Sequence, residues 1–145
     1  MEDLYYMQEF GPHMVGVGPF VPHTATRFRN EPAGTLEQTL RLLAVVRLMI
    51  PEVLLPATTA LGSIHPRGRE LGLMAGANVV MPNISPQVTR DKYLLYDGKV
   101  GTALTPDEGV ADLIRRIDST GYRAVVSRGD HRGQADIGRE ISREG

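Results

Sequence analysis

The sequence predicts an α/β fold in which short parallel strands alternate with helices. Three apolar runs support this prediction, at residues 13–18, 53–59 and 78–83. Each run ends in a turn rich in proline and small polar residues, and each is followed by a stretch with helical spacing. Because such alternation is typical of parallel sheets, we expect part of a (β/α)8 TIM-type barrel. The chain would supply the last three β/α units, a C-terminal helix and a tail.

The first unit follows the end of a helix at residues 3–10, which Gly11 and Pro12 stop. In the strand predicted for residues 13–18, alternate side chains share a face, and one face carries Met14, Gly16 and Gly18. Glycines on a strand face indicate that a ligand or a neighbouring side chain approaches the backbone closely. The loop at residues 18–34 contains three prolines, and loops of this length are often functional.

The second and third units contain further helix signals. Thr35 and Gln38 form a capping box at the start of a helix that Pro51 ends. After the second strand, a helix is predicted over residues 67–75, and its internal glycines would allow close packing on the strands. The third strand is followed by a short helix predicted over residues 85–96.

The C-terminal part begins with a strong helix start, Thr-Pro-Asp-Glu at residues 105–108. This helix is predicted to end near Thr120, before Gly121. Residues 122–127 predict a short strand outside the main repeat. Residues 128–145 are rich in glycine and charge and predict a mobile tail, which leaves residues 1–127 as the barrel portion.

Composition excludes several classes of function. The chain has 145 residues, which fits one domain, and a formal net charge of -1 without a basic stripe, so we expect no nucleic-acid partner. It contains no cysteine, which excludes disulfides, thiolate catalysis and cysteine-ligated iron–sulfur or zinc sites. No apolar run is long enough to span a membrane, and the N-terminus lacks a signal-peptide core. We therefore expect a cytoplasmic protein without a membrane partner.

Polar side chains at the ends of the predicted strands are candidate ligand contacts, because chemistry in β/α units lies on the loops that leave the strand C-termini. The hydroxyls of Thr58 and Thr59 suit a carboxylate or a phosphate-like anion. Alternatively, the two threonines are a β-branched pair that packs normally, with one hydroxyl capping a turn. Met81 is on the third strand, where methionine is normally a core residue. Asn83 is a polar candidate that also suits a bond to its own backbone.

The four histidines are scattered, which argues against a metal site. His23 lies in a proline-punctuated turn, where it suits either an acid–base role or a simple exposed loop position. His65 precedes Pro66 near a helix start, which favours a structural role. His13 is the first residue of the first predicted strand.

Four blocks of the sequence resemble one enzyme family in combination. They are GVGPFVPH, LLPATTALG, RELGLMAGANVVMPNISP and YLLYDGK, and the resemblance runs from about Tyr6 to Lys99. It is to the radical-SAM enzymes of [FeFe]-hydrogenase maturation; biotin synthase and the methylornithine synthase of pyrrolysine biosynthesis are looser relatives. The resemblance implies a partial barrel with S-adenosylmethionine and a [4Fe-4S] cluster at its mouth. The cluster would cleave that cofactor to a 5′-deoxyadenosyl radical, which would act on a small substrate, such as a cysteine-derived species, inside the barrel.

The same resemblance implies roles for particular residues. Thr58 and Thr59 would bind the substrate carboxylate, and Met81 and Met14 would line the same cavity. The segment beside the adenosine would be Gly18, Pro19, Phe20 and Val21, and the adenine would also neighbour Tyr93 and Leu95. The stretch Thr24-Ala25-Thr26 differs from the Asp-Thr-Pro that is usual in the family, which affects the expected geometry of this loop.

One departure from the family is larger. The family binds its cluster through three cysteines in a CxxxCxxC loop, and this chain has none. We therefore expect the C-terminal fragment of such a maturase, inactive alone, without assignable catalytic residues. One alternative is a non-enzymatic half-barrel that pairs with itself or with a separate N-terminal half. The other is a fragment similar to biotin synthase or methylornithine synthase.

Overall fold

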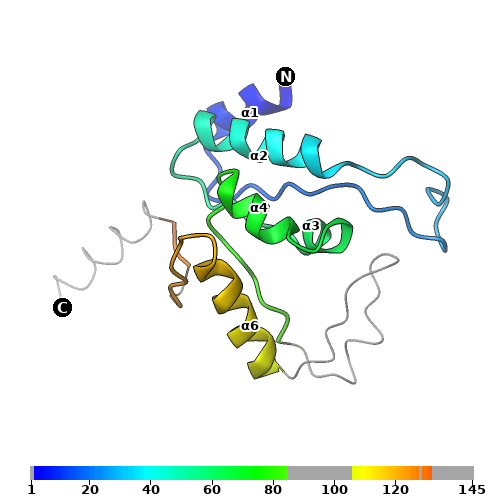
Figure 1. The fold of residues 1–145 in the computed structure, drawn as a ribbon. Coiled ribbons are helices and arrows are strands. Elements are labelled where there is room, and N and C mark those ends of the chain that lie inside the picture. Colours follow the sequence, from blue (N-terminus) through cyan, green and yellow to red (C-terminus); the bar gives the residue numbers. More distant parts are fainter. Residues whose placement is uncertain (1, 85–105, 128, 132–145) are drawn as a thin grey trace, which may run out of the picture.

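The computed structural model describes residues 2–84, 106–127 and 129–131, and its regular elements there are helices (Figure 1). These are α1 (Glu2–Phe10), α2 (Leu36–Met49), α3 (Thr59–Ile64), α4 (Gly68–Met74) and α6 (Pro106–Asp118). No strand is formed within the described ranges. Two isolated parallel bridges join Met14 to Leu54 and Pro56 to Val79 instead.

Backbone hydrogen bonds place the three predicted strand segments side by side and in the same direction. Leu54 donates to the carbonyl of His13 at 2.9 Å and accepts from the N–H of Val15 at 3.0 Å. On the other side of the central segment, the N–H of Ala57 donates to the carbonyl of Val79 at 2.9 Å. The parallel order that the sequence predicts is therefore confirmed, with the central segment between the other two.

Two residues explain why these segments form bridges and not strands. In a parallel ladder, the N–H of residue 56 would bond the carbonyl of Val15, but Pro56 has no N–H. The N–H of Leu55 bonds the side-chain Oδ1 of Asn78 at 2.8 Å, and the Asn78 Nδ2 donates to the carbonyl of Val53 at 3.4 Å. The three predicted segments therefore do not form regular strands in the described part of the chain, and the partial barrel is not confirmed.

The helix ends follow the signals in the sequence. Gly11 has φ 61° directly after α1, a conformation that glycine adopts readily. The Oγ1 of Thr35 accepts from the N–H of Gln38 at 3.2 Å at the start of α2, so the predicted N-cap is confirmed. The C-terminal helix α6 is confirmed as well.

The region between the second and third segments differs from the prediction. Thr59 begins α3 and does not end a strand, and α3 and α4 replace the one helix predicted there. His65, between the two helices, has an extended backbone (φ -151°, ψ 133°), because Pro66 disfavours a helical residue before it. A Cβ on Gly68 would lie 1.9 Å from the carbonyl oxygen of Leu61, so only glycine fits where α4 meets α3.

The strand predicted at residues 122–127 is wrong. These residues are irregular, and Val125 and Val126 are 78% and 92% exposed. They pair with no other described segment, and an unpaired strand has no stability of its own. The predicted helix at residues 85–96 and most of the predicted tail lie outside the described residues.

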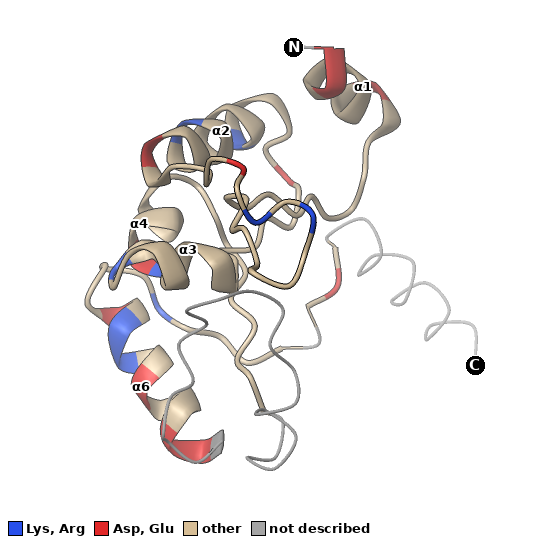
Figure 2. Ribbon diagram, turned by 90° about the vertical axis from the view of Figure 1, so that its right-hand side faces the viewer, with Lys and Arg blue, Asp and Glu red and all other residues tan. Residues whose placement is uncertain are grey.

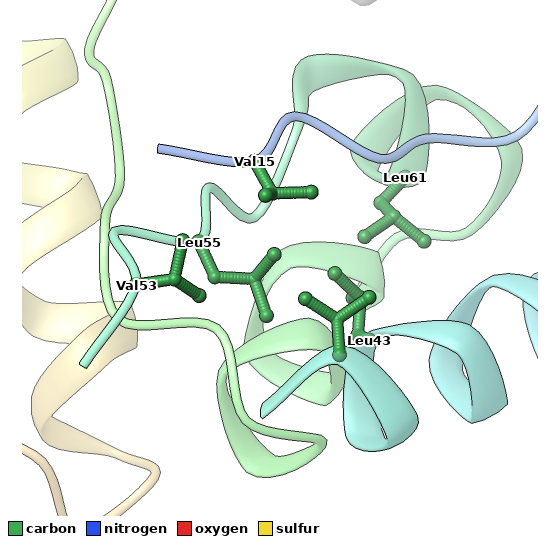
Figure 3. Close-up of a cluster of buried hydrophobic side chains, with 6 residues drawn as sticks. Val15, Leu43, Val53, Leu55 and Leu61 are labelled. Carbon is green, nitrogen blue, oxygen red and sulfur yellow. The ribbon is translucent and has the colours of Figure 1, made fainter. Parts of the chain in front are cut away.

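The core lies between the helices and the three parallel segments (Figure 3). Its main cluster is Val15, Leu43, Val46, Val53, Leu55 and Leu61. Burial of one such side chain contributes about 1.5–3 kcal/mol. A second cluster of Ala57, Leu73 and Ala77 receives Ile117 from α6. Gly72 lets α4 approach closely, because a Cβ there would lie 3.1 Å from Leu61 Cδ1 and 3.4 Å from Ala57 Cβ.

The helices follow one another in the order α1, α2, α3 with α4, and α6 in both ribbon views (Figures 1 and 2). Helix α1 therefore lies at one end of this row and α6 at the other. None of the helices in the described part is both long and apolar enough to cross a membrane.

Candidate functional site

The first and second segments also come close to each other at Gly18 and Thr58. A Cβ built on Gly18 would lie 2.8 Å from the Oγ1 of Thr58, closer than real Cβ atoms come to such an atom. The expectation of a close approach at a strand glycine is therefore confirmed at Gly18, where the neighbour is a side chain. Gly16, on the same face, has nothing within 4 Å of the corresponding position.

The hydroxyl of Thr58 is buried and has no hydrogen-bond partner in the described part of the chain. Thr58 precedes α3 with an extended backbone, and its side chain does not cap the helix. A buried polar group without a partner costs about 1–3 kcal/mol. Thr39 shows the usual arrangement, because it is also buried but its Oγ1 donates to the carbonyl of Thr35 at 2.9 Å. The Thr58 hydroxyl is therefore a buried donor without a partner among the described residues.

Thr59 has different surroundings, although it is adjacent to Thr58. It is exposed as the first residue of α3, and its Oγ1 accepts from Arg69 Nη2 at 3.4 Å. The carbonyl of Thr59 accepts from the Ser63 hydroxyl at 3.3 Å. The two threonine hydroxyls thus differ, since that of Thr58 is buried and unbonded and that of Thr59 is bonded to α4.

The two methionines predicted to line a cavity are partly exposed. Met14 is 46% and Met81 59% accessible to solvent, and neither is in the buried clusters. Met14 forms the bridge to Leu54, and Met81 follows the bridge at Val79. Their role in lining a substrate cavity stays a prediction.

Gly34 contacts residues 18–21, the segment that was predicted to lie beside an adenosine. The N–H of Gly34 donates to the carbonyl of Phe20 at 2.8 Å, and a Cβ on Gly34 would lie 2.7 Å from the Phe20 nitrogen. Pro19 is buried, Val21 is half-buried, and Phe20 is exposed. Glycine at position 34 thus lets the end of the loop approach the backbone of Phe20 closely.

Phe20 belongs to a small aromatic group. Its ring meets that of Phe28 edge-on, with centroids 6.3 Å apart and planes at 85°. The guanidinium of Arg27 lies 4.6 Å from the centroid of Phe28. Sequence reasoning did not find Phe28 or Arg27, because no spacing in this loop indicates the contact. The other two residues predicted near an adenine, Tyr93 and Leu95, lie outside the described residues.

His23 and His65 accept hydrogen bonds from backbone N–H groups two residues further along the chain. The Nδ1 of His23 accepts from the N–H of Ala25 at 3.0 Å, and its carbonyl accepts from the hydroxyl of Thr26 at 2.9 Å. His65 Nδ1 accepts from the N–H of Arg67 at 3.1 Å, which confirms the structural role predicted for His65. Within the described ranges, no group of three or more His, Cys, Asp or Glu side chains is placed to hold a metal ion.

A buried ion pair joins α6 to α4. The carboxylate of Glu70 accepts from Arg116 Nε at 2.7 Å and from Arg116 Nη2 at 2.9 Å. Burial by itself raises the pKa of Glu70. The hydrogen bonds from Arg116 and the charges of Arg116 and Arg67 lower it by more, so the pKa of Glu70 lies below its usual value. The same bonds to Glu70 raise the pKa of Arg116. None of the hydrogen bonds of this pair involves Thr58. The pair attaches α6 to α4.

Comparison with known proteins confirms the resemblance to the radical-SAM maturases. The chain is 46% identical over 100 residues to the [FeFe] hydrogenase maturase subunit HydE of Thermotoga maritima, and the match covers 69% of this chain. It is also 30% identical over 112 residues, or 77% of its length, to the 3-methylornithine synthase of Methanosarcina barkeri. The matched part of the chain is therefore HydE-like. No family model matches the chain.

The match covers only part of each relative, 29% of the HydE protein and 31% of the synthase. The donor set of the chain does not fit an iron–sulfur cluster, because such clusters are held by cysteine thiolates and the sequence has no cysteine. The free Thr58 hydroxyl fits a carboxylate or another hydrogen-bond acceptor.

Proposed function

We propose that this chain forms the Thr58-bearing wall of the substrate cavity, and the adenosine-side mouth, of a radical-SAM enzyme of [FeFe]-hydrogenase maturation. The observation that carries the proposal is the Thr58 hydroxyl, which is buried without a partner beside Gly18. Its position just before α3, in a chain similar to HydE over 69% of its length, supports this role.

Thr58 would bind its ligand by donating a hydrogen bond. An ionised carboxylate only accepts hydrogen bonds, and a hydroxyl can donate one. Hydrogen bonds to charged groups contribute about 1.5–3 kcal/mol, enough to offset the cost of the unbonded hydroxyl. Gly18 would assist, because the absence of a side chain there leaves the Thr58 Oγ1 free of a steric contact. A small carboxylate-bearing substrate, such as a cysteine-derived species, is the ligand class proposed.

The segment Gly18, Pro19, Phe20 and Val21 would form one side of the mouth. The exposed Phe20 ring, held by the Gly34 contact and by Phe28, offers an apolar surface to a nucleoside. Met14 and Met81 would line the cavity further in, and Tyr93 and Leu95 would contact the adenine. When bound with its cluster, S-adenosylmethionine would supply radical chemistry, but this chain has no ligand for that cluster.

The proposal therefore includes that these 145 residues alone do not cleave S-adenosylmethionine. Another polypeptide segment would have to supply the cluster ligands. We further propose that the protein acts in the cytoplasm, as the sequence analysis led us to expect.

A chimera tests the function. The matched segment of Thermotoga maritima HydE is replaced by the corresponding residues of this chain, the product is reconstituted anaerobically, and 5′-deoxyadenosine is measured at varied substrate concentration. We expect the chimera to form 5′-deoxyadenosine. Thr58→Val should raise the KM for substrate by about tenfold, equivalent to one lost charge-assisted hydrogen bond of about 1.4 kcal/mol.

Thr39→Val is the matched control, because it removes a buried hydroxyl that is bonded within α2. It should leave the KM unchanged. Equal KM values for the two variants would contradict the role of Thr58. Formation of 5′-deoxyadenosine by the isolated chain after reconstitution with iron, sulfide and reductant would contradict its proposed inactivity.

A further inference from the structure

The side chains of His23 and Thr26 hold the turn that leads to Phe28. The Nδ1 of His23 accepts from the N–H of Ala25 at 3.0 Å. The hydroxyl of Thr26 donates to the carbonyl of His23 at 2.9 Å and accepts from the N–H of Phe28 at 3.2 Å. Threonine commonly makes such local bonds in turns. One hydroxyl thus closes the turn and also holds the backbone at Phe28.

Phe28 is held from its other side as well. Its carbonyl accepts from the N–H of Glu31 at 3.0 Å. The guanidinium of Arg27 lies 4.6 Å from the centroid of its ring, where a cation is attracted to an aromatic face. All these contacts lie within residues 23–31, so the position of Phe28 in the loop does not depend on any segment outside the loop.

The ring of Phe28 in turn contacts that of Phe20 edge-on, with centroids 6.3 Å apart and planes at 85°. The backbone of Phe20 is held by the bond from the N–H of Gly34 to its carbonyl. An edge-on contact occupies at most one face of the Phe20 ring, and this residue is 45% exposed. Phe20 is therefore fixed in place and still has ring surface for a planar ligand group.

We propose that Thr26 and Phe28 are positioning residues, which hold the Phe20 ring where it stacks on the base of the adenosine. Thr26 acts through Phe28, and Phe28 acts through Phe20. The proposal rests on the proposed function, which places residues 18–21 beside the adenosine. Stacking requires that a flat ring face is presented to the base. A ring that is already held loses less conformational freedom on binding, so the contact with Phe28 raises the affinity for the nucleoside.

Fluorine NMR of the full chain tests the positioning. The chain has three phenylalanines, so labelling with 4-fluorophenylalanine gives three resonances, which single Phe→Leu variants assign. Thr26→Val removes the hydroxyl at nearly constant shape and should move the Phe20 and Phe28 resonances. Thr26→Ser keeps the hydroxyl and should leave both in place. The Phe10 resonance is the internal control, because this ring stacks on Tyr6 in α1 and should not move.

The chimera with Thermotoga maritima HydE tests recognition of the nucleoside. Calorimetry gives the Kd for S-adenosylmethionine, and kinetics give kcat and the KM of each substrate. Phe28→Leu keeps an apolar side chain without the ring contact and should weaken S-adenosylmethionine binding about fivefold. Thr26→Val should weaken it about threefold. Both variants should leave kcat and the KM of the other substrate unchanged. Phe10→Leu, the same change in the aromatic pair of α1, should alter none of these values.

Unmoved Phe20 and Phe28 resonances in Thr26→Val would overturn the positioning role of its hydroxyl. An equal Kd for Phe28→Leu and Phe10→Leu would overturn the role in binding the nucleoside. Equal losses in kcat and in both KM values would assign Phe28 a general structural role instead. These results leave the effect of Thr58→Val on the substrate KM intact, and the failure of Thr58→Val leaves the resonances and the Kd as they are. The two proposals therefore fail separately.

Discussion

Arg116 holds Glu70 with two hydrogen bonds, and the Nη2 of the same guanidinium donates to the carbonyl of Pro66 at 2.6 Å. The Glu70 side chain is only 8% exposed. One side chain of α6 thus bonds both α4 and the turn before it, at positions 46 and 50 residues away in the sequence. The attachment of α6 depends on this contact and on the packing of Ile117.

Arg116→Ala should destabilise the chain by about 2–3 kcal/mol, because it leaves the nearly buried Glu70 carboxylate without its partner. Urea unfolding measures the change. Arg115→Ala is the control, because Arg115 pairs with Asp112 on the surface of α6, and such pairs contribute about 0–1 kcal/mol. Equal losses in the two variants would show that the Glu70 contact does not hold α6.

Acid should weaken the fold partly through Glu70. Its pKa is lowered in the folded state, so the ionised group stabilises the fold fully above the unfolded pKa of about 4.3. This contribution is lost as the pH falls from there through the folded-state pKa. Glu70→Gln should therefore show a shallower loss of unfolding free energy below about pH 4.3 than the parent. Parallel pH curves for the two proteins would contradict the assignment.

Gly18→Ala should destabilise the chain by about 1–3 kcal/mol, because the new methyl group would overlap the Thr58 hydroxyl. Thr58→Ala in the same chain should restore most of the loss, since it removes the atom that is struck. Gly16→Ala, which has open space, is the control and should change stability little. Additive effects of the Gly18 and Thr58 substitutions would mean that the two residues do not meet.

Thr58→Val should leave the isolated chain equally stable or more stable, because it removes a buried hydroxyl without a partner. Thr39→Val should cost about 1 kcal/mol, since it breaks the bond to the Thr35 carbonyl. Thermal unfolding of both variants measures the difference. A large loss for Thr58→Val would assign its hydroxyl a structural role and would weaken the proposed ligand contact.

Local signals in the sequence predicted the ends of α1, α2 and α6 that carry them. The Thr35 cap, Gly11 and the Thr-Pro-Asp-Glu start of α6 act through neighbouring residues, and each has its expected effect. The parallel order of the three apolar segments also followed from the alternation of strand and helix. Such features need only a few adjacent residues to be read.

The absence of regular strands from the described part of the chain could not be predicted, because strand pairing depends on residues far apart in the chain. Pro56 is compatible with an extended segment. It interrupts the ladder only because the position that it occupies faces the carbonyl of Val15, to which proline cannot donate a hydrogen bond. Asn78 looked like the start of a strand, yet its side chain bonds Leu55, 23 residues earlier. The apolar run YRAVVS at residues 122–127 lacked a neighbour, which composition does not reveal.

The candidate site was predicted in part for the same reason. Thr58 and Gly18 were singled out separately, by position on a strand end and by the absence of a side chain. Only the fold shows that they meet, and that the hydroxyl of Thr59 is bonded to Arg69. Phe28 carried no signal, since its contact with Phe20 comes from the path of a loop.

The missing N–H of Pro56 has a mechanical consequence. With one bridge, the segment at residues 13–17 is joined to its neighbour through two backbone bonds at Leu54, each contributing about 1 kcal/mol. Beyond these two bonds, no backbone hydrogen bond joins the described residues Gly16 to Gly18 to the central segment. The close approach of Gly18 to Thr58 is therefore kept by the packing of Val15 and Val17 in the main core cluster, and not by ladder hydrogen bonds.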